Sequence, residues 1–379
     1  MAEGVYTERE WRLRGRCVQS SIPICWGAQY VQPVRRRNLH QNRRVHCAML
    51  VCAAVFALLL PLCWPHRAVP VSYPMAVAPV AAEGIHVRSV QGVSFAMPTG
   101  ITFVQHTYTK EELYRGKLLL IDDQHPLPMQ APHPGTLNIA TYGKGMVPVS
   151  DLNLKTGRET IRALTALFAD LRGNGIGGFS VWQGTQTPAE QLEDWLTFAR
   201  QSAGQFSLDT AIAKTQEEME PPGSGELLQE YTVELRMSTE GKAVPDERPL
   251  EETVQGRQLL RFAWRNGFVR TQTTGSKRDQ FRFRYVGIAH ATAMTYLDVD
   301  LPTYLAILHE KRTLTVQGEG GQLYLIQCVL AAGNHVVLSV PKGAEYEVSL
   351  DNTGYAVVAS VLKEGWQKRL LPAVSANSQ

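Results

Sequence analysis

The stretch Phe281–His290, with the sequence FRFRYVGIAH, constrains the fold of this 379-residue chain more than any other segment. Aromatic and basic residues alternate up to Tyr285, which is typical of a strand, and Gly287 then leads into an apolar run near Ile288–Leu297 that predicts a helix. The composition, 44% hydrophobic and 8% aromatic, is ordinary for a globular protein. We therefore expect a folded body of sheet and helix organised around this stretch.

Charge is distributed unevenly along the chain. Residues 1–46 contain nine Arg and three Glu, a net charge of +6, whereas the whole chain carries +3, so the remainder sums to −3. A nucleic-acid-binding protein concentrates its positive charge on the folded domain, and here that part is mildly acidic. We therefore expect no nucleic-acid partner.

Five of the six cysteines precede residue 64, and Cys328 is the one that falls in the presumed folded body. The sequence contains no C-x-x-C pair that would suggest a zinc site. Because Cys328 lies in the apolar run Leu323–Leu330, we expect a buried, inert thiol.

Residues 47–64, CAMLVCAAVFALLLPLCW, form an uncharged run whose length is near the lower limit for a helix that spans a bilayer. Arginines precede it and only Arg67 follows closely, which places the N-terminus in the cytoplasm and the body outside. We expect a basic cytoplasmic tail over residues 1–46, a transmembrane helix or signal anchor over residues 47–64, and a Pro/Ala/Val-rich tether over residues 65–83. The protein would then be a single-pass protein of the cell membrane with an extracytoplasmic C-terminal domain, or secreted if the apolar segment is cleaved.

Local signals predict the elements on either side of the central stretch. The apolar run Lys117–Ile121 predicts a buried strand, and Thr187 begins a capping box with proline at the first helical position. Asn266-Gly267 is a signal for the end of a helix. From about Leu314, short apolar runs alternate with turn residues, which predicts a small β-rich segment. We expect helices over residues 158–172, 188–202, 251–265 and 288–297 and after Asp300.

These motifs together resemble one family, the zinc D-Ala-D-Ala carboxypeptidases of the VanY type, which remove the terminal D-alanine from peptidoglycan stem peptides. The matching segments follow the family's order: residues 118–128, 158–172, 262–268, 283–287 with His290 after them, and 301–308. The resemblance implies an α+β fold with a small antiparallel sheet flanked by helices, as in Hedgehog and D,D-peptidase domains. We expect this domain over residues 84–311, with residues 312–379 as a C-terminal β-rich appendage.

The residues that this family uses to bind zinc are replaced in this chain. The family's ligands are a His, an Asp seven residues later and the His of a Glu-x-x-His motif whose Glu is the base. Those positions hold Leu227, Glu234 and Arg282, with Asp279 as the equivalent of the base. Leucine has no lone pair and arginine is a permanent cation, so Glu234 is the remaining candidate metal ligand. We expect no cofactor, although the family binds zinc, and we expect Glu234 and Arg282 to form an ion pair instead.

The substrate side of the family's site is altered as well. The Ser-Gly-Tyr-Arg motif, whose Arg grips a substrate carboxylate, falls on residues 183–186, so Gln186 replaces that Arg. Gln191 of the family pattern is kept. The candidate substrate-binding residues are therefore Gln186 and Gln191.

The resemblance and the replacements together favour a membrane-anchored, extracytoplasmic D-Ala-D-Ala carboxypeptidase-like protein that is catalytically degenerate. Its expected partner is a peptidoglycan stem peptide or an envelope protein, bound through the former catalytic cleft. The alternative is an active D-alanyl-D-alanine carboxypeptidase with a displaced or unusual site. A third interpretation, a structural scaffold whose contacts are made by the C-terminal appendage, is left open by the sequence.

Overall fold

The computed structural model describes residues 90–362, with gaps at residues 115, 128–134, 239–244 and 272–278. The expected basic tail, apolar segment and tether, residues 1–83, lie outside the described residues. None of the helices within the described ranges is both long and apolar enough to cross a membrane.

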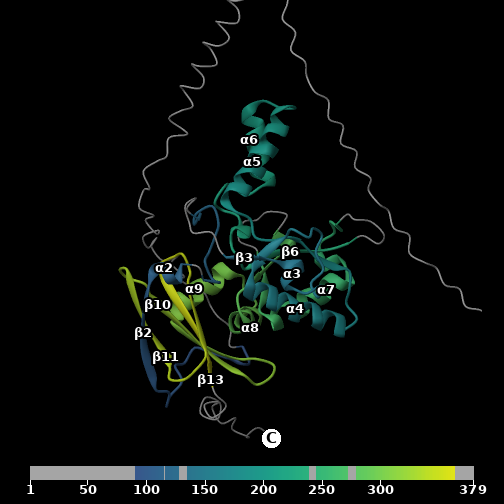
Figure 1. The fold of residues 1–379 in the computed structure, drawn as a ribbon. Helices are drawn as coiled ribbons and strands as arrows, with labels where there is room; N and C mark the ends of the chain where they lie inside the picture. The colour runs from purple at the N-terminus through teal and green to yellow at the C-terminus, as the bar shows by residue number, and fades with distance from the viewer. Residues whose placement is uncertain (1–89, 115, 128–134, 239–244, 272–278, 363–379) are drawn as a thin grey trace, which may run out of the picture. The chain divides into compact units, whose positions relative to one another are not determined.

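A four-stranded antiparallel sheet contains the stretch around which the sequence is organised (Figure 1). Its strands, in spatial order, are β5 (Phe179–Gln183), β6 (Thr232–Met237), β8 (Arg282–Tyr285) and β7 (Phe268–Arg270). The expected strand is thus confirmed as β8, which pairs with a neighbour on each side and follows the 3-10 helix η5 (Asp279–Phe281).

Helices cover the apolar face of this sheet because their apolar residues recur at helical spacing. The helix α4 (Arg158–Gly173) confirms the expected helix, and its buried side chains pack with those of β6 and β8 in one core. The core residues from these three elements are Ile161, Leu164, Leu167, Phe168, Leu171, Val233, Leu235 and Phe283. Burial of one such side chain stabilises the fold by about 1.5–3 kcal/mol.

The helix expected over residues 251–265 is confirmed at its end, whereas the α-helix itself begins at Val254. Thr253 accepts a hydrogen bond from the backbone N–H of Gly256 at 2.9 Å and so caps α7 (Val254–Phe262). The 3-10 helix η4 (Ala263–Asn266) follows, and Gly267 ends it with a left-handed φ of 81°. A Cβ at this φ would be strained, which explains the glycine.

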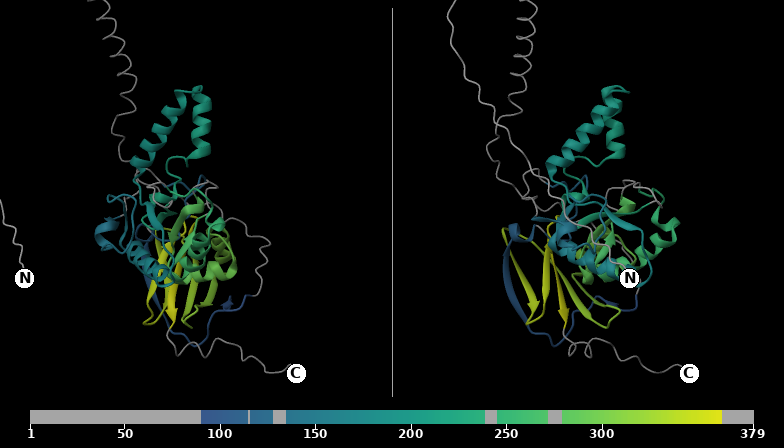
Figure 2. Two further views of the ribbon diagram at one scale, coloured as in Figure 1. Left: turned by 90° about the vertical axis from the view of Figure 1, so that its right-hand side faces the viewer. Right: turned by 45° about the vertical axis from the view of Figure 1, so that its right-hand side comes forward.

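A pair of helices and several short elements connect these strands. The helix α5 begins with the expected capping box at Thr187, whereas α6, which packs along α5, was not predicted (Figures 1 and 2). The bounds are β3 (Thr136–Asn138), α3 (Ile139–Tyr142), β4 (Lys155–Gly157), α5 (Pro188–Ala203), α6 (Leu208–Glu218), η2 (Glu226–Leu228) and η3 (Leu250–Glu252).

Strands from both ends of the described chain build a second region of sheet, in which the blue early strands lie beside the green and yellow late ones (Figure 2). A five-stranded sheet has the order β1 (Val93–Ser94), β9 (Thr313–Gln317), β10 (Leu323–Leu330), β13 (Tyr355–Leu362) and β12 (Tyr346–Leu350). A separate pair joins β2 (Phe103–Thr109) to β11 (His335–Pro341), and α2 (Lys110–Leu113) follows β2. The strands predicted from about Leu314 therefore take partners from the start of the described chain.

Two helices lie between the central sheet and these late strands in the sequence. They are α8 (Ile288–Leu297) and α9 (Leu301–Lys311), and both contribute to a core with β9, β10 and β13. Cys328 is buried in this core, and burial raises the pKa of its thiol to about 12, in line with the expected inert residue.

The segment Lys117–Ile121, buried from Leu118 onward, is not a strand, which corrects the sequence-based prediction. The backbone N–H of Leu118 donates to the hydroxyl of Ser349 at 3.0 Å, and the carbonyl of Leu119 accepts from Nε2 of Gln229 at 2.9 Å. Side chains therefore satisfy backbone groups that a neighbouring strand would otherwise satisfy. An apolar run indicates burial, and it does not distinguish a strand from irregular buried chain.

Candidate functional site

The positions that the resemblance assigns to zinc binding lie on neighbouring elements of the fold. Glu234 on β6 is the direct register partner of Arg282 on β8, and Leu227 lies in η2, which precedes β6. These three residues are buried, with exposed fractions of 2–3%. Asp279 begins η5, the turn that leads into β8.

A buried ion pair fixes the side chain of Arg282. Its Nη1 contacts Oε1 of Glu220, and its Nη2 donates to Oε2 of the same carboxylate at 3.2 Å. The side chains are 3% and 10% exposed, respectively. A two-point contact between guanidinium and carboxylate is strong and directional. Arg282 is therefore a fixed cation at the position where the family has a neutral metal ligand.

Glu234 has a different partner from the one expected. Its Oε1 accepts from Nε of Arg236, two residues further along β6 and on the same face, and Nη1 of Arg236 also donates to Glu247 at 2.6 Å. The guanidinium of Arg236 lies 4.4 Å from the centroid of the Phe281 ring. The expected pair between Glu234 and Arg282 is thus replaced by two separate pairs, although the two backbones are adjacent.

These residues do not fit a zinc ion. Leu227 has no donor atom, Arg282 is a cation, and the carboxylate of Glu234 is held by Arg236. Within the part of the chain that the structure describes, no group of three or more His, Cys, Asp or Glu side chains is placed to hold a metal ion. The arrangement therefore offers one carboxylate, already paired, where a zinc hydrolase needs about three ligands and an open position.

The two candidate substrate-binding glutamines have partners within the protein. Nε2 of Gln186 donates to Oδ2 of Asp194 at 2.9 Å. Gln191 is 5% exposed, and its Oε1 accepts from the backbone N–H of Gly223 at 2.7 Å. Both side chains therefore hold neighbouring parts of this chain in place, and a contact with substrate stays a prediction.

Gly184, the glycine of the altered substrate motif, lies against the backbone of β4. A Cβ added there would lie 2.2 Å from the carbonyl oxygen of Lys155, which also accepts from the N–H of Thr185 at 2.8 Å. We expect Gly184→Ala to lower the free energy of unfolding by about 1–3 kcal/mol in urea titrations, because the backbone would have to shift. Gly177→Ala is the control, since nothing lies within 4 Å of its new Cβ. Equal losses in the two variants would contradict this close packing.

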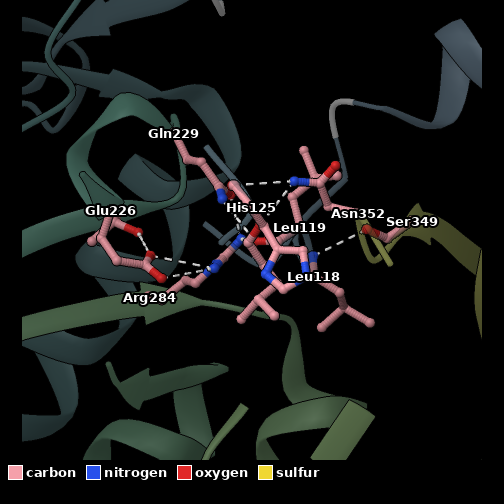
Figure 3. A network of polar contacts seen from close by, with 10 residues as sticks. Leu118, Leu119, His125, Glu226, Gln229, Arg284, Ser349 and Asn352 are labelled. Carbon is pink, nitrogen blue, oxygen red and sulfur yellow. Dashed lines mark hydrogen bonds and ion pairs between the residues drawn. The ribbon is translucent and has the colours of Figure 1, made fainter. Parts of the chain in front are cut away.

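A second buried arginine lies on the same face of β8, two residues after Arg282. Arg284 is 0% exposed, and its Nη1 donates to the two carboxylate oxygens of Glu226 at 3.2 and 3.3 Å (Figure 3). Its Nη2 donates to the carbonyl of Leu119 and to Oε1 of Gln229. Burial lowers the pKa of Arg284, and the charge of Glu226 opposes this effect, so the guanidinium remains protonated.

This network connects η2, β8 and the buried irregular segment. Asn352, in the turn between β12 and β13, extends it by donating to the carbonyl of Leu120 at 3.0 Å (Figure 3). The pairing of Arg284 with Glu226 was not predicted from the sequence. Their separation along the chain gave no signal of the contact.

Comparison with known proteins identifies the relatives of this fold. A D-alanyl-D-alanine carboxypeptidase of Enterococcus faecium is 22% identical over 265 residues, which cover 67% of this chain and 78% of that protein. The solved structure of the vancomycin-resistance D,D-dipeptidase VanXYg, in complex with a D-Ala-D-Ala phosphinate analogue, matches with a TM-score of 0.56 and 18% identity. That match covers 69% of this chain and 100% of VanXYg. The chain therefore shares the fold of the VanY-type D,D-peptidases, as the resemblance in sequence predicted.

The match with VanXYg confirms the predicted fold class, a mixture of helices and antiparallel sheet with a D,D-peptidase-like arrangement. No protein-family model matches the chain. Within this VanY-type fold, Glu220 and Arg236 are the two residues of the former metal site that the sequence did not reveal. Glu220 contacts Arg282 from a distant part of the chain, and Arg236 contacts Glu234 because both lie on one face of β6.

Proposed function

We propose that this chain is a VanY-type protein that binds cell-wall peptides without hydrolysing them. The observation that carries the proposal is the pair of buried salt bridges, Arg282 with Glu220 and Glu234 with Arg236, at the positions of the family's metal ligands. A zinc hydrolase activates water through the metal, and here the charges of the site are already matched within the protein.

The ligand that we propose is the end of a peptidoglycan stem peptide. The relative from E. faecium is named for D-alanyl-D-alanine, and the solved VanXYg structure holds a D-Ala-D-Ala phosphinate analogue. Gln186 would contribute a weaker contact than the family's Arg, since an amide cannot form the charged two-point contact that a guanidinium makes with a carboxylate. We therefore expect weak, saturable binding and no release of product.

We also propose that the protein acts outside the cytoplasm, held to the membrane by residues 47–64. The support is the uncharged run itself and the nine Arg in the 46 residues before it. Such a position would place the peptidase-like fold next to the cell wall. An envelope protein that docks on the former cleft is a further partner compatible with this location.

The test of this proposal measures zinc, turnover and binding on the same preparation. The full-length protein, purified in detergent, is assayed for zinc by atomic absorption and for D-alanine released from a stem pentapeptide. The E. faecium D-alanyl-D-alanine carboxypeptidase serves as the positive control. We expect no stoichiometric zinc, no D-alanine and saturable binding of the pentapeptide by calorimetry.

Two other outcomes would overturn the proposal. About one zinc per chain together with D-alanine release would establish a working carboxypeptidase with a displaced site. The absence of both turnover and pentapeptide binding would favour a structural scaffold instead.

A further inference from the structure

A cavity whose lining includes neither Glu234 nor Arg282 carries a different set of charged groups from the former metal site. It has a volume of about 250 Å³ and is lined by residues of five separate segments, among them Lys117, Glu159, His290 and Glu347. Tyr231, which precedes β6, also lines it, whereas Glu234 and Arg282 do not. Pockets for drug-sized ligands measure about 300–1,000 Å³, so this one, the Lys117 cavity, suits a smaller molecule.

Lys117 is fixed inside this cavity by two carboxylates. Its Nζ lies 2.9 Å from Oε2 of Glu159 and also contacts Oε2 of Glu347. The ammonium lies 4.9 Å from the centroid of the Tyr285 ring. Burial alone would lower the pKa of Lys117, but the two carboxylates outweigh it and raise that pKa above its ordinary value. Lys117 is therefore a permanent cation here.

His290 presents an N–H donor to the cavity. It is 2% exposed, and its Nδ1 lies 2.9 Å from the hydroxyl of Tyr304, a fully buried group that has this one hydrogen-bond partner among the described residues. A buried hydroxyl donates to an available acceptor, so Nδ1 accepts and the proton of His290 is on Nε2. Nε2 lies 4.0 Å from Oε1 of Glu347, which is too far for a hydrogen bond.

His290 stays neutral under ordinary conditions. Burial, with a smaller contribution from the charge of Lys117, lowers its pKa to about 3. The Nε2–H is therefore a neutral donor that lies at the cavity and has no hydrogen-bond acceptor among the described residues. An oxygen atom of a ligand in the cavity would satisfy it.

The rim of the cavity carries an excess of negative charge. Glu112, Glu159 and Glu347 contribute three negative charges against the single positive charge of Lys117. The side chains of Glu159 and Glu347 are 54% and 34% exposed. A Cβ on Gly287, the N-cap of α8, would lie 2.3 Å from Oε1 of Glu347, so this carboxylate sits against the start of that helix. The helix dipole stabilises the carboxylate as an anion.

We propose that the Lys117 cavity binds a small zwitterion with the chemistry of an α-amino acid. The ammonium group of the ligand would pair with the exposed carboxylates of Glu159 and Glu347, and its oxygen would accept from Nε2 of His290. The carboxylate of the ligand would also face the ammonium of Lys117. This site is independent of the proposed function, because it uses none of the residues at the former metal site.

Calorimetry and NMR on the full-length protein test this proposal. The probes are alanine as the zwitterion, ethylamine as the cation alone and propionate as the anion alone. We expect alanine to bind saturably, and each of the other two to bind at least about tenfold more weakly. We also expect alanine to shift the Nε2 resonance of His290 in the unmodified protein, a readout that needs no variant.

Variants of residues that line the Lys117 cavity test whether alanine binds there. Glu347→Gln and Glu159→Gln each remove a negative charge while keeping the side-chain shape, and each is expected to raise the Kd for alanine about tenfold, or about 1.4 kcal/mol. Glu310→Gln, on α9 beside Lys311, removes the same charge elsewhere and should leave the Kd unchanged. The proposal is overturned if alanine fails to bind up to about 10 mM, or if all three variants change the Kd equally.

Discussion

Glu226→Gln is expected to lower the free energy of unfolding by about 3–5 kcal/mol, the usual cost of removing one partner from a buried ion pair. The reason is the position of Arg284, which is 0% exposed and has Glu226 as its carboxylate partner at 3.2 Å. Gln keeps the shape of Glu but not its charge, so the variant leaves a buried cation uncompensated. Urea unfolding followed by circular dichroism measures the effect.

The control for this prediction is a double variant. Glu226→Leu combined with Arg284→Met replaces the buried pair by apolar side chains and should be less destabilising than Glu226→Gln alone, because no charge is left behind. Glu310→Gln controls for the change in net charge. A loss below about 1 kcal/mol for Glu226→Gln would mean that water reaches the guanidinium.

Arg282→Ala is expected to cost a similar amount, about 3–5 kcal/mol, because it leaves the carboxylate of Glu220 almost buried and without its guanidinium partner. The same titration in urea measures this loss. The variant removes one of the two salt bridges at the family's metal site, the one between Arg282 and Glu220. An unchanged midpoint of unfolding would contradict the buried pair.

A double-mutant cycle identifies the partner of Arg282. Combined with Glu220→Gln, Arg282→Ala should show a coupling energy of about 1–3 kcal/mol, as residues in one ion pair do. The cycle with Glu234→Gln should show a smaller coupling, since Oε1 of Glu234 is held by Arg236. A larger coupling energy with Glu234→Gln than with Glu220→Gln would instead support the ion pair between Glu234 and Arg282 that the sequence predicted.

Local signals in the sequence were sufficient for much of the fold. The alternating pattern before Tyr285 predicted β8, the capping box at Thr187 predicted the start of α5, and Gly267 marked the end of η4. Each of these signals depends on residues that are close together in the sequence, so it can be read without knowing the tertiary contacts. The family resemblance supplied the order of the elements.

Contacts between residues far apart in the chain could not be predicted from the sequence. Lys117–Ile121 has the apolar character of a strand, yet groups from Gln229 and Ser349, more than a hundred residues away, satisfy its backbone. In the same way, Glu220 reaches Arg282 from the loop after α6, and no local pattern marks that approach. The positions of the candidate site were therefore predictable, but their partners were not.

The pairing of β1 with β9 and of β2 with β11 has a consequence for the order in which this chain can fold. Val93 pairs with Val316, and Tyr108 pairs with Val336, so the strands made early in synthesis find their partners only after most of the chain has left the ribosome. Contacts this distant in sequence slow folding. The edge of β1 stays unpaired until residues 313–317 emerge, and that of β2 until residues 335–341 emerge. Unpaired strand edges of this kind are sites of aggregation during folding.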